Sequence, residues 1–227
     1  MVNPRSIPSV VFRGQEDTLM ERVHALSSGG RVILGICGPP GAGKSTLAAW
    51  LAGAFPADRT RVVSMDGFHL SNAALDAQGL TQRKGAIETF DGDGYAALLT
   101  RIRDGHDPVV YAPGFDRAHE EPIAATGAVE RDIPLIITEG NYLLADGPSW
   151  TRARQQMDEV WFVDVDPDLR RQRLVERHVQ FGKTRTEAMA WVQSVDEGNA
   201  ESIADSRQRA DLIVHLVDDL DVPAAVG

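Results

Sequence analysis

The sequence predicts an α/β fold in which a mostly parallel central sheet carries helices on both faces. Short runs that are apolar along most of their length are typical of strands covered on both faces, and here they alternate with runs expected to be helical. Alternating strands and helices favour a parallel sheet. With 227 residues, 43% of them hydrophobic, the chain can bury one sizeable core, so we expect residues 1–227 to form a single domain.

Five strands are expected, at residues 32–37, 61–65, 134–138, 160–165 and 212–217. Helices are expected at residues 16–27, 45–55, 94–103, 150–157, 168–181 and 186–209. Residues 67–130 have a less regular pattern and are richer in Gly, Pro, Asp and aromatic residues. That composition is typical of functional loops at one end of a sheet.

The overall charge limits the partners of the protein. A net charge of −10 and a pI near 5.0 oppose non-specific binding to nucleic acid or to an anionic membrane, because both need a positive surface. The single cysteine, Cys37, allows no internal disulfide, and its apolar neighbours predict a small buried residue. No run is long and apolar enough for a membrane span, and the first residues do not resemble a signal peptide. We therefore expect a cytoplasmic protein.

A glycine- and proline-rich segment, "GICGPPGAGKSTLAAWL" at residues 35–51, joins the first expected strand to the helix at 45–55. It matches the P-loop motif G-x-x-x-x-G-K-[ST] through Gly38, Pro39, Pro40, Gly41, Ala42, Gly43, Lys44 and Ser45, and Thr46 follows. Glycines let the backbone approach a polyphosphate, so that backbone N–H groups and the start of the helix face the anion. Lys44 is expected to reach the β and γ phosphates of ATP, and the Ser45 hydroxyl to ligate Mg²⁺.

The alternative is a glycine-rich turn that Lys-Ser follows by chance, but both flanking elements have the order that the motif requires. Lysine usage also supports the motif: the 23 basic residues include only three lysines, Lys44, Lys84 and Lys183. We expect Lys44 to be an exposed loop residue that contributes little to the core.

Two acidic residues follow expected strands: Asp66 in "VVSMDGFHL" and Glu139 in "LIITEGNYLL". Because the carboxyl ends of parallel strands meet at the ligand-binding edge of a sheet, these carboxylates should converge beside the phosphates. Phosphoryl transfer needs an acid near the metal and a group that orients the attacking hydroxyl, and either residue could instead cap a helix. The "DGDG" run at 91–94 lacks the glutamate of an EF-hand and is expected to start a helix.

The chain resembles the phosphoribulokinase and uridine kinase family of P-loop kinases, which includes bacterial pantothenate kinase. The similar segments are "GPPGAGKST", "MDGFHLSNAALDAQGLTQRKGAIETFDGDGY", "VYAPGFDRAHEEPI", "EGNYLL" and "DEGNAESI", spread over residues 38–203. Within the family the chain is most similar to the bacterial nucleoside/nucleotide kinase-like group, also known as fructose-transport-system kinases. The resemblance implies a P-loop NTPase three-layer sandwich with a helical lid.

The resemblance also implies roles for individual residues. Lys44 and Ser45 would bind phosphates and Mg²⁺, Asp66 would activate the acceptor, and Glu139 would be the acid on the metal side. The residues implied for the acceptor pocket are His69, Arg83, Lys84, Asp91, Tyr111, Phe115, Arg117, Asn141 and Tyr142. Asn199 falls where the family carries an asparagine near the nucleotide base, although a helix cap would explain it equally well.

Arginines at residues 170, 173 and 177 share one face of the expected helix at 168–181, because their spacing keeps them within about 60° of one another. In the family this region is a lid, here about residues 168–187, whose arginines stabilise charge on the transferred group. We expect Arg173 to bind the nucleotide and Arg177 to act in catalysis. The sequence does not decide which arginine contacts the γ-phosphate, and a solvated helix face is the alternative.

These observations predict an ATP- and Mg²⁺-dependent kinase that phosphorylates a hydroxyl of a small metabolite. A sugar or polyol is the expected acceptor, and a nucleoside or a pantothenate-like compound is the alternative. Outside the kinases, the alternative is a P-loop ATPase or nucleotide-sensing regulator that uses no acceptor. Neither nucleic acid nor a membrane is expected as a partner, and assembly as a homodimer is left open.

Overall fold

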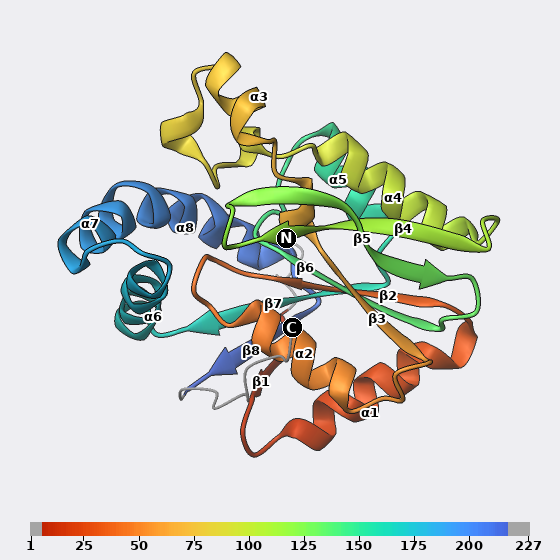
Figure 1. The fold of residues 1–227 in the computed structure, drawn as a ribbon. Helices are drawn as coiled ribbons and strands as arrows, with labels where there is room; N and C mark the ends of the chain where they lie inside the picture. The colour runs from red at the N-terminus through yellow and green to blue at the C-terminus, as the bar shows by residue number, and fades with distance from the viewer. Residues whose placement is uncertain (1–5, 218–227) are drawn as a thin grey trace, which may run out of the picture.

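The structure, a computed structural model, describes residues 6–217. Within this range six strands form one parallel sheet in the order β1-β8-β7-β2-β6-β3 (Figure 1). They are β1 (Ser9–Val11), β2 (Val32–Cys37), β3 (Thr60–Ser64), β6 (Leu135–Gly140), β7 (Glu159–Val165) and β8 (Leu212–Leu216). The predicted α/β class with a parallel sheet is therefore confirmed.

Helices cover both faces of this sheet. The helices of the described residues are α1 (Glu16–Leu26), α2 (Lys44–Gly53), α3 (Asn72–Ala77), α4 (Gly92–Asp104), α5 (Pro148–Gln155), α6 (Pro167–Gln180), α7 (Arg185–Trp191) and α8 (Glu197–Ala204). Figure 1 shows α1 and α2 on one side of the sheet and α4 and α5 on the other. Three layers result, as predicted.

Successive residues of β2 point to opposite faces and enter two separate cores. Leu34 and Ile36 pack in the core under α1 and α2, whereas Ile33 and Cys37 pack in the core under α4 and α5. Cys37 is fully buried, as predicted, and burial raises the pKa of its thiol to about 11. Strands that are buried on both faces explain the continuous apolar runs of the sequence.

The five predicted strands are all present, and their ends differ from the predicted ones by at most two residues. Three further features were not predicted, and one of them is the short helix α3. Strand β1 has only three residues, and the segment expected to be loops contains an antiparallel hairpin of β4 (Val109–Asp116) and β5 (Glu121–Glu130). Much of β5 is exposed, so its residues lack the apolar pattern of the central strands.

The predicted helix at 186–209 is helical throughout but not uniform. Between α7 and α8 the chain forms a π-helical turn at Val192–Asp196, and a 3₁₀ turn at Asp205–Arg209 follows α8. A capping box of Thr184 and Glu187 starts α7. A π turn adds one residue to the helical repeat and often occurs at functional sites.

The hairpin packs against the 3₁₀ turn at Met65–Phe68 that follows β3. A Cβ built on Gly67 would lie 2.4 Å from the carbonyl oxygen of Pro113 in β4, so only glycine allows this approach. The hairpin is thereby held beside Asp66.

No helix within residues 6–217 is long and apolar enough to cross a membrane. The predicted domain bounds of 1–227 also include residues 1–5 and 218–227, which lie outside the described residues.

Candidate active site

The P-loop lies between β2 and α2 and has the backbone of a phosphate cradle. Gly41 and Gly43 have φ angles of 77° and 91°, a region that favours glycine. A Cβ on Gly41 would lie 2.7 Å from Leu174 Cγ and 3.0 Å from the carbonyl oxygen of Arg170. The loop is therefore packed against α6, with α2 starting at Lys44. The N-terminus of a helix and nearby backbone N–H groups form a site suited to an anion.

Lys44 is buried, with 8% of its surface exposed, which corrects the expectation of an exposed loop lysine. Its Nζ donates a hydrogen bond to the Pro39 carbonyl oxygen at 3.0 Å. Burial lowers the pKa of Lys44, while the nearby Glu139 and Asp66 carboxylates act in the opposite direction. An ammonium that is desolvated and lies beside a cradle gains most from a phosphate ligand.

Asp66 and Glu139 are brought together, as their positions after neighbouring strands suggest. Ser64 lies opposite Glu139 in the pairing of β3 with β6, and its Oγ donates to Glu139 Oε1 at 2.6 Å. The same Oγ accepts the backbone N–H of Asp66 at 3.2 Å. Burial and the neighbouring Asp66 charge raise the pKa of Glu139. One serine hydroxyl thus ties the two acidic positions together.

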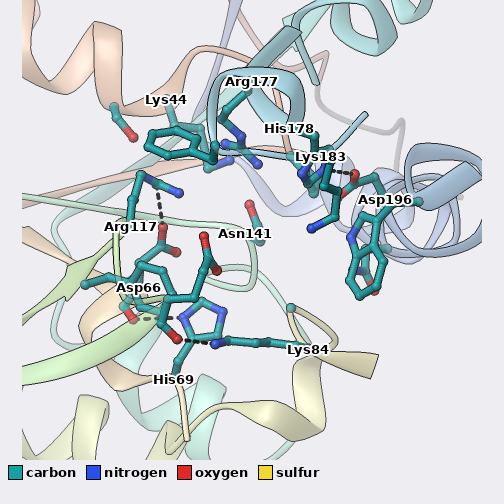
Figure 2. Close-up of a pocket in the computed structure, with 18 of the residues that line it drawn as sticks. Lys44, Asp66, His69, Lys84, Arg117, Asn141, Arg177, His178, Lys183 and Asp196 are labelled. Carbon is teal, nitrogen blue, oxygen red and sulfur yellow. Dashed lines mark hydrogen bonds and ion pairs between the residues drawn. The ribbon is translucent and has the colours of Figure 1, made fainter. Parts of the chain in front are cut away.

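A cavity of about 330 Å³ lies at this edge of the sheet (Figure 2). Twelve of the predicted site residues line it: Pro40, Lys44, Ser45, Asp66, His69, Lys84, Phe115, Arg117, Glu139, Asn141, Arg177 and Asn199. The volume is near the lower end for small-molecule sites. All three lysines of the chain line this one cavity.

The wall near Asp66 is formed by the 3₁₀ turn and the hairpin. Arg117 Nη2 pairs with Asp66 Oδ2 at 3.1 Å, and His69 Nδ1 is 2.8 Å from the Asp66 carbonyl oxygen. The His69 ring lies against Phe90 and Phe115, with ring centroids 3.9 and 4.7 Å apart. Burial lowers the pKa of His69, which favours the neutral imidazole near pH 7. These contacts fix the position of Asp66 from two sides.

The opposite wall comes from α6 and the helical segment after it. Arg177 lines the cavity, and burial together with the nearby Arg117 lowers its pKa. His178 Nε2 is 2.9 Å from Oδ2 of the buried Asp196, which belongs to the π turn. The Lys183 Nζ lies 5.0 Å from the centroid of the Trp191 ring. Figure 2 shows Arg177, His178 and Lys183 together on this side.

The three arginines of the expected stripe separate in the structure. Arg170 is buried, pairs with Glu197 of α8, and approaches the Pro40 carbonyl oxygen at 3.5 Å. It joins the P-loop to α8, whereas Arg177 faces the cavity. Arg173 lies outside the set of lining residues.

Four residues implied for the acceptor pocket lie outside the cavity lining. Asp91 caps α4 by accepting the Gly94 N–H at 2.8 Å, as the "DGDG" turn predicted. Tyr111 is 61% exposed on β4, and Arg83 pairs with Glu88 at 2.6 Å. Tyr142 is buried, donates to the Gly85 carbonyl oxygen at 2.8 Å and supports the loop beside Lys84.

The remaining P-loop positions, Gly38, Pro39, Gly41, Ala42, Gly43 and Thr46, also lie outside the lining side chains. Asn199 lies beside the acceptor segment, since its Nδ2 would be 3.7 Å from a Cβ on Gly85. Its neighbour is therefore the loop at 81–85, although the family resemblance associates it with the nucleotide.

Nine lining residues were not predicted: Asn72, Thr81, Gly85, Glu120, His178, Phe181, Lys183, Trp191 and Asp196. The sequence carried a signal for one of them, because Lys183 is among the three lysines. Four of the others lie in the segment of residues 72–120, and four lie in the lid and the helical segment after it, where the direction of Asp196 depends on the extra residue of the π turn.

The residues of the cradle fit a nucleotide–Mg²⁺ complex. Mg²⁺ is usually bound by one or two carboxylates together with substrate phosphates, and no cluster of three or more His, Cys, Asp or Glu suited to a metal occurs within residues 6–217. Ser45 at the start of α2 and the buried Glu139 supply a hydroxyl and a carboxylate beside the phosphate cradle. They are the residues that would hold the ion.

Comparisons with known proteins agree with this geometry. The model of the phosphoribulokinase/uridine kinase family matches residues 33–223. A Schizosaccharomyces pombe protein named "putative uridine kinase C227.14" is 36% identical over 183 residues, which cover 77% of this chain and 78% of that protein. Escherichia coli YggC is 34% identical over 193 residues, which cover 83% of this chain and 79% of YggC.

A solved structure gives the same result. The crystal structure of a "putative fructose transport system kinase" from Silicibacter sp. TM1040 is 38% identical, with a TM-score of 0.79 over 86% of this chain and 97% of that one. The predicted resemblance is confirmed, and this chain belongs to the phosphoribulokinase/uridine kinase family of P-loop kinases.

Proposed function

We propose that this kinase transfers the γ-phosphoryl group of ATP to a hydroxyl of a small sugar or polyol. The observation that carries the proposal is one cavity that holds both a phosphate cradle with Lys44 and a carboxylate, Asp66, beside a separate polar wall. In Figure 2, Asp66 lies between Lys44 and the side chains of His69 and Lys84. An acceptor bound against that wall would bring its hydroxyl next to Asp66.

Asp66 would orient the hydroxyl and accept its proton late in the reaction. An ordinary carboxylate cannot remove a proton from an alcohol in the ground state, but the oxygen becomes acidic as its bond to phosphorus forms. The acceptor oxygen then bonds to the γ-phosphorus, the bond from that phosphorus to the bridging oxygen of ADP breaks, and the proton moves to Asp66. Arg117 would keep the carboxylate in place during this step.

Lys44 and Arg177 would stabilise the charge that spreads over the transferred group. Mg²⁺, held by Ser45 and Glu139, would neutralise phosphate charge. The neutral His69 ring and the amides of Asn72 and Asn141 provide hydrogen-bonding groups for acceptor hydroxyls. Relatives named for uridine and fructose transport also suggest acceptors that carry sugar hydroxyls.

The test is a screen of sugars, polyols, nucleosides and pantothenate with Mg·ATP, followed by ADP release and by mass spectrometry of the product. We expect ADP formation that depends on the acceptor, with a phosphorylated sugar or polyol as product. A slow ADP release that is the same with every compound would instead indicate an ATPase or a nucleotide-sensing regulator.

A further inference from the structure

We propose that the acceptor carries an acidic group, a carboxylate or a phosphate, which binds between the ammonium groups of Lys84 and Lys183. This inference rests on the proposed kinase function and specifies its substrate class as a sugar acid or a sugar phosphate. The observation behind it is that the lysines outside the P-loop both line the same cavity, on opposite walls.

Lys84 is held in place by neutral partners. Its Nζ donates to Asn72 Oδ1 at 2.6 Å and to the Glu120 carbonyl oxygen, and it lies 5.4 Å from the centroid of the Phe115 ring. Partial burial lowers the pKa of Lys84, against the attraction of Glu120 and Glu121. A fixed ammonium with no ion pair among the described residues retains most of its attraction for an anionic ligand.

Lys183 approaches the cavity from the lid. Its ammonium lies over the Trp191 ring, and no carboxylate of the described residues forms an ion pair with it. The buried carboxylate on this wall, Asp196, is engaged by His178. Lys183 is therefore also available to an anion in the cavity.

Unlike Lys84 and Lys183, several arginines of the chain form ion pairs with carboxylates. Arg101, Arg103 and Arg154 pair with Asp107, Asp158 and Asp211, as expected for a protein with a net charge of −10. In the cavity itself, Arg117 is paired with Asp66, and Arg177 is the arginine proposed to meet the transferred phosphoryl group. Glu120 also lines the cavity and attracts Lys84, but neither lysine forms an ion pair among the described residues. Two such ammonium groups in one cavity indicate a ligand that supplies further negative charge.

The position of Lys84 separates this anion from the triphosphate of ATP. Lys84 belongs to the loop at 81–85, which faces Asn199 of α8, whereas the triphosphate is expected along residues 38–45. An acceptor hydroxyl at Asp66 and an acidic group near Lys84 would span the wall formed by the His69 and Phe115 rings. The alternative, that the lysines bind phosphates of ATP, predicts a loss of nucleotide affinity when they are replaced.

The first experiment compares acceptors that differ only in the acidic group: gluconate with glucitol, glycerate with glycerol, and fructose 6-phosphate with fructose. We expect the acidic member of at least one pair to be preferred by about 10-fold or more in kcat/KM, on the scale of a hydrogen bond to a charged group. Lys84→Met and Lys183→Met should each raise the KM of that acceptor by about 10-fold or more, with ATP affinity within about 2-fold of the parent. Arg101→Met, which removes an exposed paired cation on α4, is the control and should change neither value.

The second experiment does not need turnover. With the nucleotide site filled by the magnesium complex of a non-hydrolysable ATP analogue, inorganic phosphate and acetate are titrated by calorimetry, as probes for a phosphate and for a carboxylate. We expect one of them to bind to the parent and to the Arg101→Met protein, and to bind about 10-fold more weakly to Lys84→Met and Lys183→Met. Thermal melting shows whether each variant is folded.

The outcomes separate this inference from the proposed function. Preference for the neutral members, or binding of neither probe to the parent, would overturn the acidic acceptor and leave a kinase for neutral sugars. Weakened ATP binding in the lysine variants would assign the lysines to the nucleotide and also overturn it. Lysine-dependent binding of a probe without any acceptor-dependent ADP release would support the anion site and contradict the kinase.

Discussion

Ser64 connects the two acidic positions, Asp66 and Glu139, through two hydrogen bonds of its hydroxyl. Its hydroxyl donates a hydrogen bond to Glu139 and accepts one from the Asp66 backbone N–H, so one side chain fixes both the buried carboxylate and the start of the 3₁₀ turn. Replacing Ser64 with alanine leaves the buried Glu139 short of a donor. The Ser64→Ala substitution should therefore affect catalysis as well as stability.

We expect Ser64→Ala to lower kcat by about 10-fold while ATP affinity stays within about 2-fold, because hydrogen bonds to charged groups contribute about 1.5–3 kcal/mol. Steady-state kinetics and nucleotide titration measure both values. Thr100→Ala, which removes a hydroxyl bonded to the Ala96 carbonyl oxygen on α4, is the control. A variant with a lower melting temperature and the kcat of the parent would limit Ser64 to a structural role.

The lowered pKa of Lys84 predicts that binding of an acidic acceptor depends on pH. Its folded-state pKa lies below the ordinary lysine value because of burial, so the ammonium loses its proton at lower pH than a free lysine does. The KM of an acidic acceptor should therefore rise as the pH increases from about 7 towards the ordinary lysine value of about 10.4. In Lys84→Arg the guanidinium stays charged, so the KM should remain flat over the same range. Parallel KM profiles in the two proteins would remove Lys84 from acceptor binding.

At the scale of elements, the β4–β5 hairpin and the 3₁₀ turn after β3 form one wall of the site. The hairpin carries Phe115 and Arg117 lies at its turn, and its approach to the 3₁₀ turn depends on the missing Cβ of Gly67. Gly67→Ala should push the hairpin away from Asp66 and lower the free energy of unfolding by about 1–3 kcal/mol. Chemical denaturation measures that loss, and acceptor-dependent turnover should fall more than ATP affinity. Unchanged stability in the Gly67→Ala protein would show that the hairpin is free to shift.

The lid makes a separate prediction. Arg177 faces the cavity from α6, where its guanidinium would contact the phosphoryl group chiefly as charge develops. We expect Arg177→Gln to lower kcat by about 10²–10³, the scale for loss of one donor to a developing charge, with ATP affinity changed by only a few fold. Presteady-state phosphoryl transfer and ATP titration test this directly. Equal turnover in the parent and the variant would exclude Arg177 from the reaction.

The elements also show which features a sequence can predict. Strands β2, β6 and β7 are buried on both faces, so their apolar runs predict them with little ambiguity. The hairpin could not be predicted in this way, because apolar and polar residues alternate poorly along its exposed strands. Its register also contains an irregularity between Ala112 and Gly114. The π turn could not be predicted either, because the sequence does not indicate the extra helical residue that directs Asp196 inward.

For the whole molecule, the parallel topology gathers the site at one edge. Residues at or just after the carboxyl ends of β2, β3 and β6 meet there, which is why Lys44, Asp66 and Glu139 could be predicted together from motifs far apart in the chain. The opposite wall could not be predicted in the same way. It depends on how α6, α7 and α8 fold back over the P-loop, through contacts such as Arg170 with Glu197.

This arrangement requires that ATP use depends on an acceptor held at Asp66. The most direct measurement compares acceptor-dependent ADP release and ATP affinity in the parent and in Asp66→Asn, which keeps the shape of the side chain and removes its charge. We predict a loss of about 10²-fold or more in turnover, the scale of a general base, with ATP affinity close to that of the parent. Turnover within a few fold of the parent would contradict the role of Asp66 as the base, because Asp66 would then be only a structural residue of the 3₁₀ turn.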